Sequence, residues 1–203
     1  MSFIKNLPNL LTISRIVMIF IFVVFANISA DKINFVKIPD EVSDACHMIA
    51  FIIAVLAGLT DFLDGKIARK YKCESDFGRL MDPVADKIFI AAVFIMLADY
   101  RIIPAWIVVV VLSREFLVTG LRLLAISDGV VIAADKSGKF KTAFQMLALL
   151  IGGAGWVRLF GFNIFHPTIW VAWYCILLAV TFFTIYSGAS YFVKNYKLFQ
   201  NKF

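Results

Sequence analysis

Apolar residues run along this chain in six long stretches that are separated by shorter polar segments. The stretches are Leu10–Ala30, His47–Ile67, Ala85–Ala98, Pro104–Leu124, Thr142–Trp156 and Thr168–Phe192. A helix needs about 20 apolar residues to cross a bilayer, and unpaired backbone groups in hydrocarbon are costly. The pattern therefore predicts six membrane-spanning helices. The third and fifth stretches are short, so we expect those helices to extend into the flanking polar sequence.

Composition supports lipid as the main solvent of this chain. Hydrophobic residues make up 62% of the sequence, against roughly 45–50% in soluble domains, and 21 of its 203 residues are Phe. The mean hydropathy is +0.88. A soluble domain of this length could not bury so much apolar surface. We predict an all-α integral membrane protein that forms a single domain over residues 1–203, because no polar stretch is long enough for a second one.

The distribution of positive charge predicts the orientation of the spans. With the N-terminus inside, 16 of the 20 Lys and Arg residues lie on the cytoplasmic side and four lie outside. The four outside are Lys32, Lys37, Arg101 and Arg158. This bias predicts that both termini are cytoplasmic. We attribute the net charge of +6 to loops that face anionic lipid and not to nucleic-acid binding, because no nucleic-acid motif is present.

Four aspartates lie at adjoining ends of two predicted spans. Asp61 and Asp64 end the second apolar stretch, and Asp82 and Asp86 begin the third. Spacings of three and four residues place each pair on one helix face. Four carboxylates without nearby Cys or His suit Mg²⁺ or Mn²⁺, and two such ions can hold a diphosphate during a displacement. The alternative is an ion-pair network with Lys66, Arg69, Arg79 and Lys87.

The residues from 61 to 86 also carry a resemblance to a known family. They read Asp-x2-Asp-Gly-x2-Ala-Arg-x8-Gly-x3-Asp-x3-Asp, which is eight specified positions at fixed gaps. This pattern resembles, at every fixed position, the signature of the CDP-alcohol phosphatidyltransferases. Members of that family have six spans with the signature between spans two and three, so the resemblance extends over the whole chain. It disfavours the ion-pair alternative.

The resemblance implies a role for each signature residue. Asp61, Asp64, Asp82 and Asp86 would hold two divalent ions against the diphosphate of a CDP-lipid. Asp86 would also be the catalytic base that takes the proton of the acceptor hydroxyl, which attacks the β-phosphorus and releases CMP. The residues implied to bind the CDP-lipid are Asn9, Thr12, Asp61, Gly65, Ala68, Arg69, Ser75, Gly78 and Asp82. For Asn9 and Thr12 the alternative is a polar cap on an interfacial helix.

Five cations near the cytoplasmic side are candidates for binding a phosphate on the acceptor alcohol. They are Arg114 and Arg122 at the end of the fourth stretch, and Lys136, Lys139 and Lys141 in the loop before the fifth. An unpaired guanidinium in the apolar run around Arg114 would be costly. We therefore expect Arg114 to pair with Glu115, with the aspartates or with an anionic ligand. For the three lysines, the alternative is ordinary positive charge in a cytoplasmic loop.

The segments that carry these cations resemble their counterparts in bacterial family members that use sn-glycerol 3-phosphate. The resemblance implies an enzyme of the bacterial cytoplasmic membrane that transfers a phosphatidyl group from CDP-diacylglycerol to sn-glycerol 3-phosphate. It also implies a homodimer, the assembly common in the family. Its polar active-site cavity would open to the cytoplasm. Inositol phosphate and phosphatidylglycerol remain alternative acceptors. A cation-coupled transporter is the alternative of a different class, but the acids gather at one membrane face and no internal repeat is present.

Overall fold

The computed structural model describes residues 2–28, 38–71, 76–127 and 136–200. Within these ranges it describes side chains except at residues 2–9, 11, 61–80, 82, 83, 127, 136, 137 and 197–200. The described backbone contains six α-helices and no strand, which confirms the all-α prediction. The helices are α1 (Ser2–Asn27), α2 (Asp40–Tyr71), α3 (Asp76–Asp99), α4 (Ala105–Ser127), α5 (Lys136–Trp156) and α6 (Pro167–Gln200). A single 3-10 turn, η1 (Leu159–Gly161), precedes α6.

Local signals in the sequence account for several helix starts. Pro167 is the first residue of α6, and Pro104 immediately precedes α4. Proline is favoured at helix starts because its fixed φ suits the first turn, where its missing N–H would have no intrahelical partner. The first turn of α2 holds Asp40 and Glu41, whose negative charges stabilise the positive end of the helix dipole.

Both short apolar stretches belong to longer helices, as expected. The helix α3 begins at Asp76 and α5 at Lys136, ahead of the apolar runs that start at Ala85 and Thr142. Even α5, with 21 residues, is about 31 Å long at 1.5 Å per residue. The lysine-rich segment before Thr142 is therefore helical and not a loop. The hydroxyl of Thr142 donates to the carbonyl of Gly138 at 3.1 Å, one turn earlier.

Two described helical segments are long and apolar enough to cross a membrane. They are Asp40–Thr60 and Pro167–Tyr196, each with a mean hydropathy of 2.0. In α4 the apolar run is interrupted by Arg114, Glu115 and Arg122. The number of spans, six, stays a prediction, as does the cytoplasmic placement of both termini.

Large apolar side chains are exposed on every helix. Examples, one from each helix in order, are Phe20, Ile52, Ile95, Val109, Leu150 and Phe182. Scattered exposed apolar residues are ordinary in soluble proteins, but long helices with such residues along their length are typical of helices that face lipid. This surface agrees with the membrane class predicted from composition.

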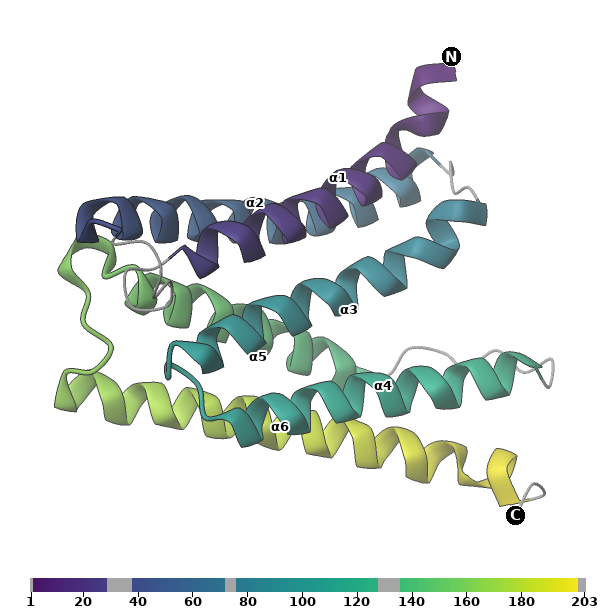
Figure 1. Cartoon of the computed structure of the whole chain (residues 1–203). Coiled ribbons are helices and arrows are strands. Elements are labelled where there is room, and N and C mark those ends of the chain that lie inside the picture. Colours follow the sequence, from purple (N-terminus) through teal and green to yellow (C-terminus); the bar gives the residue numbers. More distant parts are fainter. Residues whose placement is uncertain (1, 29–37, 72–75, 128–135, 201–203) are drawn as a thin grey trace. The chain divides into compact units, whose positions relative to one another are not determined.

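The described residues divide into two compact units, Met1–Asp99 and Tyr100–Phe203. The single domain over residues 1–203 stays a prediction. In the first unit, α1 packs along α2 and also contacts α3 (Figure 1). Small residues of α2, including Ala50, Ala54 and Ala57, are buried at helical spacing and permit close approach of the neighbouring helices. The ring of Phe89 in α3 lies against Gly58, where an added Cβ would be 3.5 Å from it.

In the second unit, α6 contacts both α4 and α5 (Figure 1). The buried indole of Trp173 donates a hydrogen bond of 3.0 Å to the carbonyl of Ile102, which ties α6 to the segment before α4. The rings of Phe144 and Phe183 stack with centroids 4.7 Å apart and join α5 to α6. These contacts fix how far α5 and α6 are shifted along their axes relative to each other, and α6 relative to the start of α4. They therefore also fix which polar residues of the three helices lie near one another.

Candidate active site

The signature residues lie on two consecutive helices. Residues 61–69 are in the last third of α2, and residues 78–86 are in the first half of α3. Ser75 lies outside the described residues. Five peptide links join Tyr71 to Asp76, so their Cα atoms are at most about 18 Å apart. Both helices continue past the aspartates, so each pair lies about two to three turns inside α2 or α3 and not at a helix end as the apolar stretches had predicted. That the two pairs face one another stays a prediction.

Of the four predicted metal ligands, the structure describes the side chain of Asp86. It is half-buried on α3, between the buried residues Ala85 and Phe89. The side chains of Asp61, Asp64 and Asp82 lie outside the description, and so do the surroundings of the predicted CDP-lipid contacts Gly65, Ala68, Arg69 and Gly78. Among the described side chains, no group of three or more His, Cys, Asp or Glu residues gathers to hold a metal ion. The metal ligand set stays a prediction.

The first helix buries two polar side chains in the same unit. Thr12 and Arg15 are each 1% exposed and lie three residues apart, on one face of α1. Thr12 is one of the predicted CDP-lipid contacts, and the backbone of Asn9 continues the same face one turn earlier. Arg15 was not a predicted site residue. A buried guanidinium in a membrane helix is costly, and that cost was the sequence signal that could have identified it.

A second polar cluster lies between α4 and α5. The Nζ atom of Lys141 donates to Oε1 of Glu115 in an ion pair between two buried side chains. The same carboxylate oxygen lies 3.6 Å from Nη1 of Arg114. Arg114 also interacts electrostatically with Arg122 and Tyr191. The structure therefore pairs Arg114 with Glu115, which was one of the expected partners.

The structure brings three of the five predicted acceptor-phosphate cations into this cluster. Arg114 and Lys141 share the carboxylate of Glu115, and Arg122, whose side chain is exposed, acts on Arg114 electrostatically. Lys139 is exposed, and the side chain of Lys136 lies outside the description. Among the described side chains of this cluster, three cations and the carboxylate of Glu115 give an excess of two positive charges. Such an excess suits a phosphate monoester, which carries close to two negative charges and accepts hydrogen bonds from guanidinium groups.

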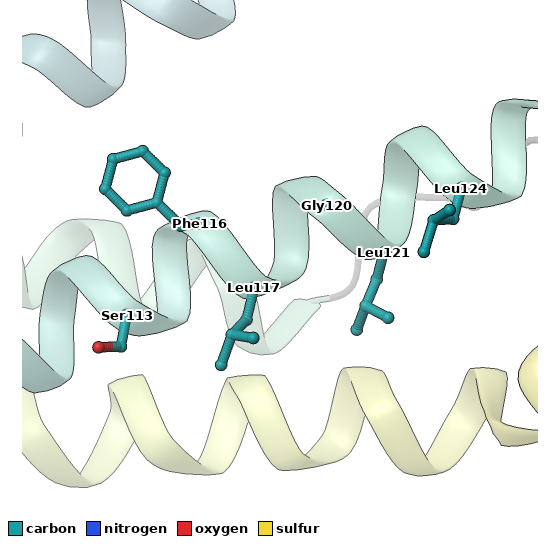
Figure 2. Close-up of a pocket in the computed structure, with 6 residues that line it drawn as sticks. All are labelled: Ser113, Phe116, Leu117, Gly120, Leu121 and Leu124. Carbon is teal, nitrogen blue, oxygen red and sulfur yellow. The ribbon is translucent and has the colours of Figure 1, made fainter.

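An open hollow of about 630 Å³ runs beside α4. Its lining residues are Ser113, Phe116, Leu117, Gly120, Leu121 and Leu124. Figure 2 shows Leu117, Leu121 and Leu124 projecting to one side of α4 and Phe116 to the other. Ser113 supplies the one polar side chain of this lining, so the hollow is apolar. It is not the polar cavity that the sequence predicted, and that cavity stays a prediction.

Comparison with known proteins identifies the family. The model of the CDP-alcohol phosphatidyltransferase family matches residues 5–184, which is most of the chain. The chain belongs to the CDP-alcohol phosphatidyltransferase family. The resemblance stated from residues 61–86 is thereby confirmed, and the matched range contains all four aspartates and all five predicted acceptor-phosphate cations.

Individual relatives of this CDP-alcohol phosphatidyltransferase align over most of the chain. A protein of Bacillus subtilis (strain 168) is 38% identical over 95% of this chain and 96% of its own length. A protein of Rickettsia felis is 35% identical over 96% of this chain and 98% of its own. Both are named CDP-diacylglycerol–glycerol-3-phosphate 3-phosphatidyltransferase. A Mycobacterium tuberculosis protein named probable phosphatidylglycerophosphate synthase is 36% identical over 72% of this chain and 65% of its own.

Proposed function

We propose that this protein transfers a phosphatidyl group from CDP-diacylglycerol to sn-glycerol 3-phosphate and so forms phosphatidylglycerophosphate and CMP. The observation that carries this proposal is the alignment, over nearly the full chain, with relatives named for that reaction. The complete aspartate signature and the excess positive charge around Arg114 agree with it.

The aspartate pairs on α2 and α3 would form a site for two Mg²⁺ or Mn²⁺ ions. Asp61, Asp64, Asp82 and Asp86 would hold them, because hard cations prefer carboxylate oxygens and the two pairs flank the connection between successive helices. When bound, such ions neutralise the charge of a diphosphate. The small residues Gly65, Ala68 and Gly78 would let the CDP-lipid approach the backbone, with Arg69 on a phosphate. Asn9, Thr12 and Ser75 would contact the nucleotide.

The reaction itself is a displacement at phosphorus. Asp86 would accept the proton from the primary hydroxyl of the acceptor. That oxygen forms a bond to the β-phosphorus of CDP-diacylglycerol, and the bond from this phosphorus to the bridging oxygen breaks, so that CMP leaves with the bonding pair. Positioning and charge neutralisation are what a phosphoryl-type transfer requires of a protein.

The acceptor phosphate would lie at the cation cluster of α4 and α5. Arg114 and Arg122 would donate to its oxygens, and Lys136 and Lys139 would add positive charge from the first turn of α5. Lys141 has its Nζ on Glu115, so its part would be to supply charge beside the phosphate. Glu115 would hold α4 and α5 at the spacing that the phosphate needs.

Replacement of Arg114 by Ala is expected to raise the KM for sn-glycerol 3-phosphate by about 10- to 100-fold, because a charge-assisted hydrogen bond to phosphate is lost. The KM for CDP-diacylglycerol should change by less than about twofold. Steady-state CMP release with each substrate varied in turn measures both. The exposed Arg101, replaced by Ala, is the matched control and should leave both values unchanged. Equal increases in the two KM values for Arg114→Ala would contradict the proposal that Arg114 binds the phosphate of the acceptor.

We further propose six spans with both termini in the cytoplasm, a location in the bacterial cytoplasmic membrane, and a homodimer built from one domain per chain. The bias of 16 cations to four supports the orientation. The lengths of the helices support the number of spans, since each of the six has at least 21 residues.

The experiment that tests the function is CMP release by detergent-purified protein with CDP-diacylglycerol and one acceptor at a time, with and without Mg²⁺ or Mn²⁺. Release is expected with sn-glycerol 3-phosphate and the divalent ion together. Release with inositol phosphate or phosphatidylglycerol instead would keep the family and replace the acceptor. Folded protein that releases no CMP with any alcohol would contradict the transferase activity.

A further inference from the structure

Two buried side chains in the second unit have polar atoms with no internal hydrogen bond. Gln145 of α5 is 0% exposed, and neither its Nε2 nor its Oε1 atom has a hydrogen-bond partner. Thr184 of α6 is 0% exposed, and its hydroxyl has no partner either. Buried amides and hydroxyls are almost always hydrogen-bonded, because leaving them unpaired carries their full desolvation cost. These atoms are therefore placed to receive a polar ligand or water.

Thr184 differs from the neighbouring hydroxyl residues of α6 in its hydrogen bonding. Thr181, one turn earlier on α6, donates to the carbonyl of Leu177 at 2.9 Å. Ser187 donates to the carbonyl of Thr184 at 3.3 Å. Hydroxyls in apolar helices commonly satisfy themselves in this way. Thr184 does not, although it lies on the same helix.

Both side chains lie next to the cation cluster. Gln145 is one turn from Lys141 on α5, and both are buried, so they share a helix face. Thr184 is one turn from Gly188, where an added Cβ would lie 3.1 Å from Cγ of Arg114. Phe144 and Phe183, which immediately precede Gln145 and Thr184 in the sequence, stack on each other. The two polar residues therefore lie at the same height along α5 and α6.

The cluster itself has further unpartnered atoms. Nε of Arg114 and the hydroxyl of Tyr191 are buried without a hydrogen-bond partner, and Tyr191 interacts electrostatically with Arg114. Unpaired donors and acceptors thus come from α4, α5 and α6 around one charged centre. A ligand that satisfies them needs an anionic group for Arg114 and neutral groups that both donate and accept beside it.

We propose that Gln145 and Thr184 bind the hydroxyl-bearing part of the acceptor, next to the phosphate at Arg114, and so select a polyol phosphate over a simple alkyl phosphate. This rests on the proposed function. An alcohol O–H donates one hydrogen bond and accepts others, and the amide of Gln145 together with the hydroxyl of Thr184 offers both roles. On sn-glycerol 3-phosphate, Gln145 and Thr184 would form hydrogen bonds with the secondary hydroxyl, which does not react.

The test compares two acceptors that share the phosphate and the reacting primary hydroxyl. These are sn-glycerol 3-phosphate and 3-hydroxypropyl phosphate, which lacks the secondary hydroxyl. Wild-type protein is expected to prefer the first by about 10- to 100-fold in kcat/KM, because a site built to hydrogen-bond a hydroxyl rejects the analogue without it. Gln145→Met and Thr184→Val should each reduce that preference by about 5- to 50-fold through loss on sn-glycerol 3-phosphate alone.

The chain offers a matched control and a check on folding. Thr181→Val removes a buried hydroxyl that is bonded within its own helix, and it should leave the preference unchanged. Because Gln145 and Thr184 make no internal hydrogen bonds, their apolar replacements should keep or raise the thermal unfolding midpoint of the unliganded protein. Thr184→Ser, which retains the hydroxyl, should restore the preference.

Each outcome has a distinct meaning. Wild-type protein that releases CMP with neither acceptor would contradict the proposed function itself. If wild-type protein uses both acceptors equally, Gln145 and Thr184 bind only ordered water, and the proposed polyol site is wrong. Variants that lose activity with both acceptors by the same factor would also overturn it, since the two residues would then act through the packing of the helices.

Discussion

Asp86→Asn is expected to lower the rate of CMP release by about 10²- to 10⁴-fold while the protein stays folded. An amide cannot take the proton of the acceptor hydroxyl, and it is a weaker ligand than a carboxylate for a hard cation. The replacement has nearly the same shape, and Asp86 is half-buried on α3 beside Ala85 and Phe89, so packing should be kept. The measurements are CMP release with saturating substrates and the thermal unfolding midpoint in detergent.

The same helix supplies the control for this variant. Asp99 is exposed at the last residue of α3, far along the helix from the signature, and Asp99→Asn should leave the rate unchanged. Binding of CDP-diacylglycerol by Asp86→Asn should persist in part, because three other carboxylates remain. A rate within about tenfold of wild type would remove the assignment of Asp86 as the base.

Glu115→Ala should lower the free energy of unfolding by about 3–5 kcal/mol, one of the largest effects expected of a single replacement here. The variant leaves the ammonium of Lys141 buried without its carboxylate, and it removes the charge that lies 3.6 Å from Arg114. Uncompensated charges inside a packed, low-dielectric region are strongly unfavourable. Denaturant unfolding in detergent, followed by helical content, measures the change.

A double replacement separates the loss of the pair from the loss of packing. Glu115→Leu with Lys141→Met removes both charges and should recover most of the stability, because an apolar pair of similar volume is often neutral or stabilising. Its KM for sn-glycerol 3-phosphate should change less than in Arg114→Ala, since loss of one cation together with one carboxylate leaves the net charge of the cluster unchanged. Lys139→Met, at an exposed position of the same helix, is the control and should change stability by less than about 0.5 kcal/mol. A loss of stability in Lys139→Met as large as that in Glu115→Ala would contradict the importance of the buried pair.

Local sequence determined the secondary structure and the placement of the signature. Apolar stretches predicted six helices because hydropathy and backbone hydrogen bonding act over neighbouring residues, and all six are present in the described backbone. The ends of α3 and α5 extended past their apolar runs, as their short lengths required. The eight signature positions identified the family, since fixed spacing on two successive helices needs no knowledge of how distant helices pack.

The contacts between distant helix faces could not be predicted in the same way. Arg114 had several expected partners, and only the packing of α4 against its neighbours selected Glu115 and joined it to Lys141. Gln145 and Thr184 carried no motif, because a single amide or hydroxyl in an apolar stretch looks the same whether it is solvated, self-bonded or buried. Their burial, and that of Arg15 on α1, is decided by which face of each helix meets another. That choice depends on side-chain packing between residues far apart in the chain, so it is a property of the tertiary structure.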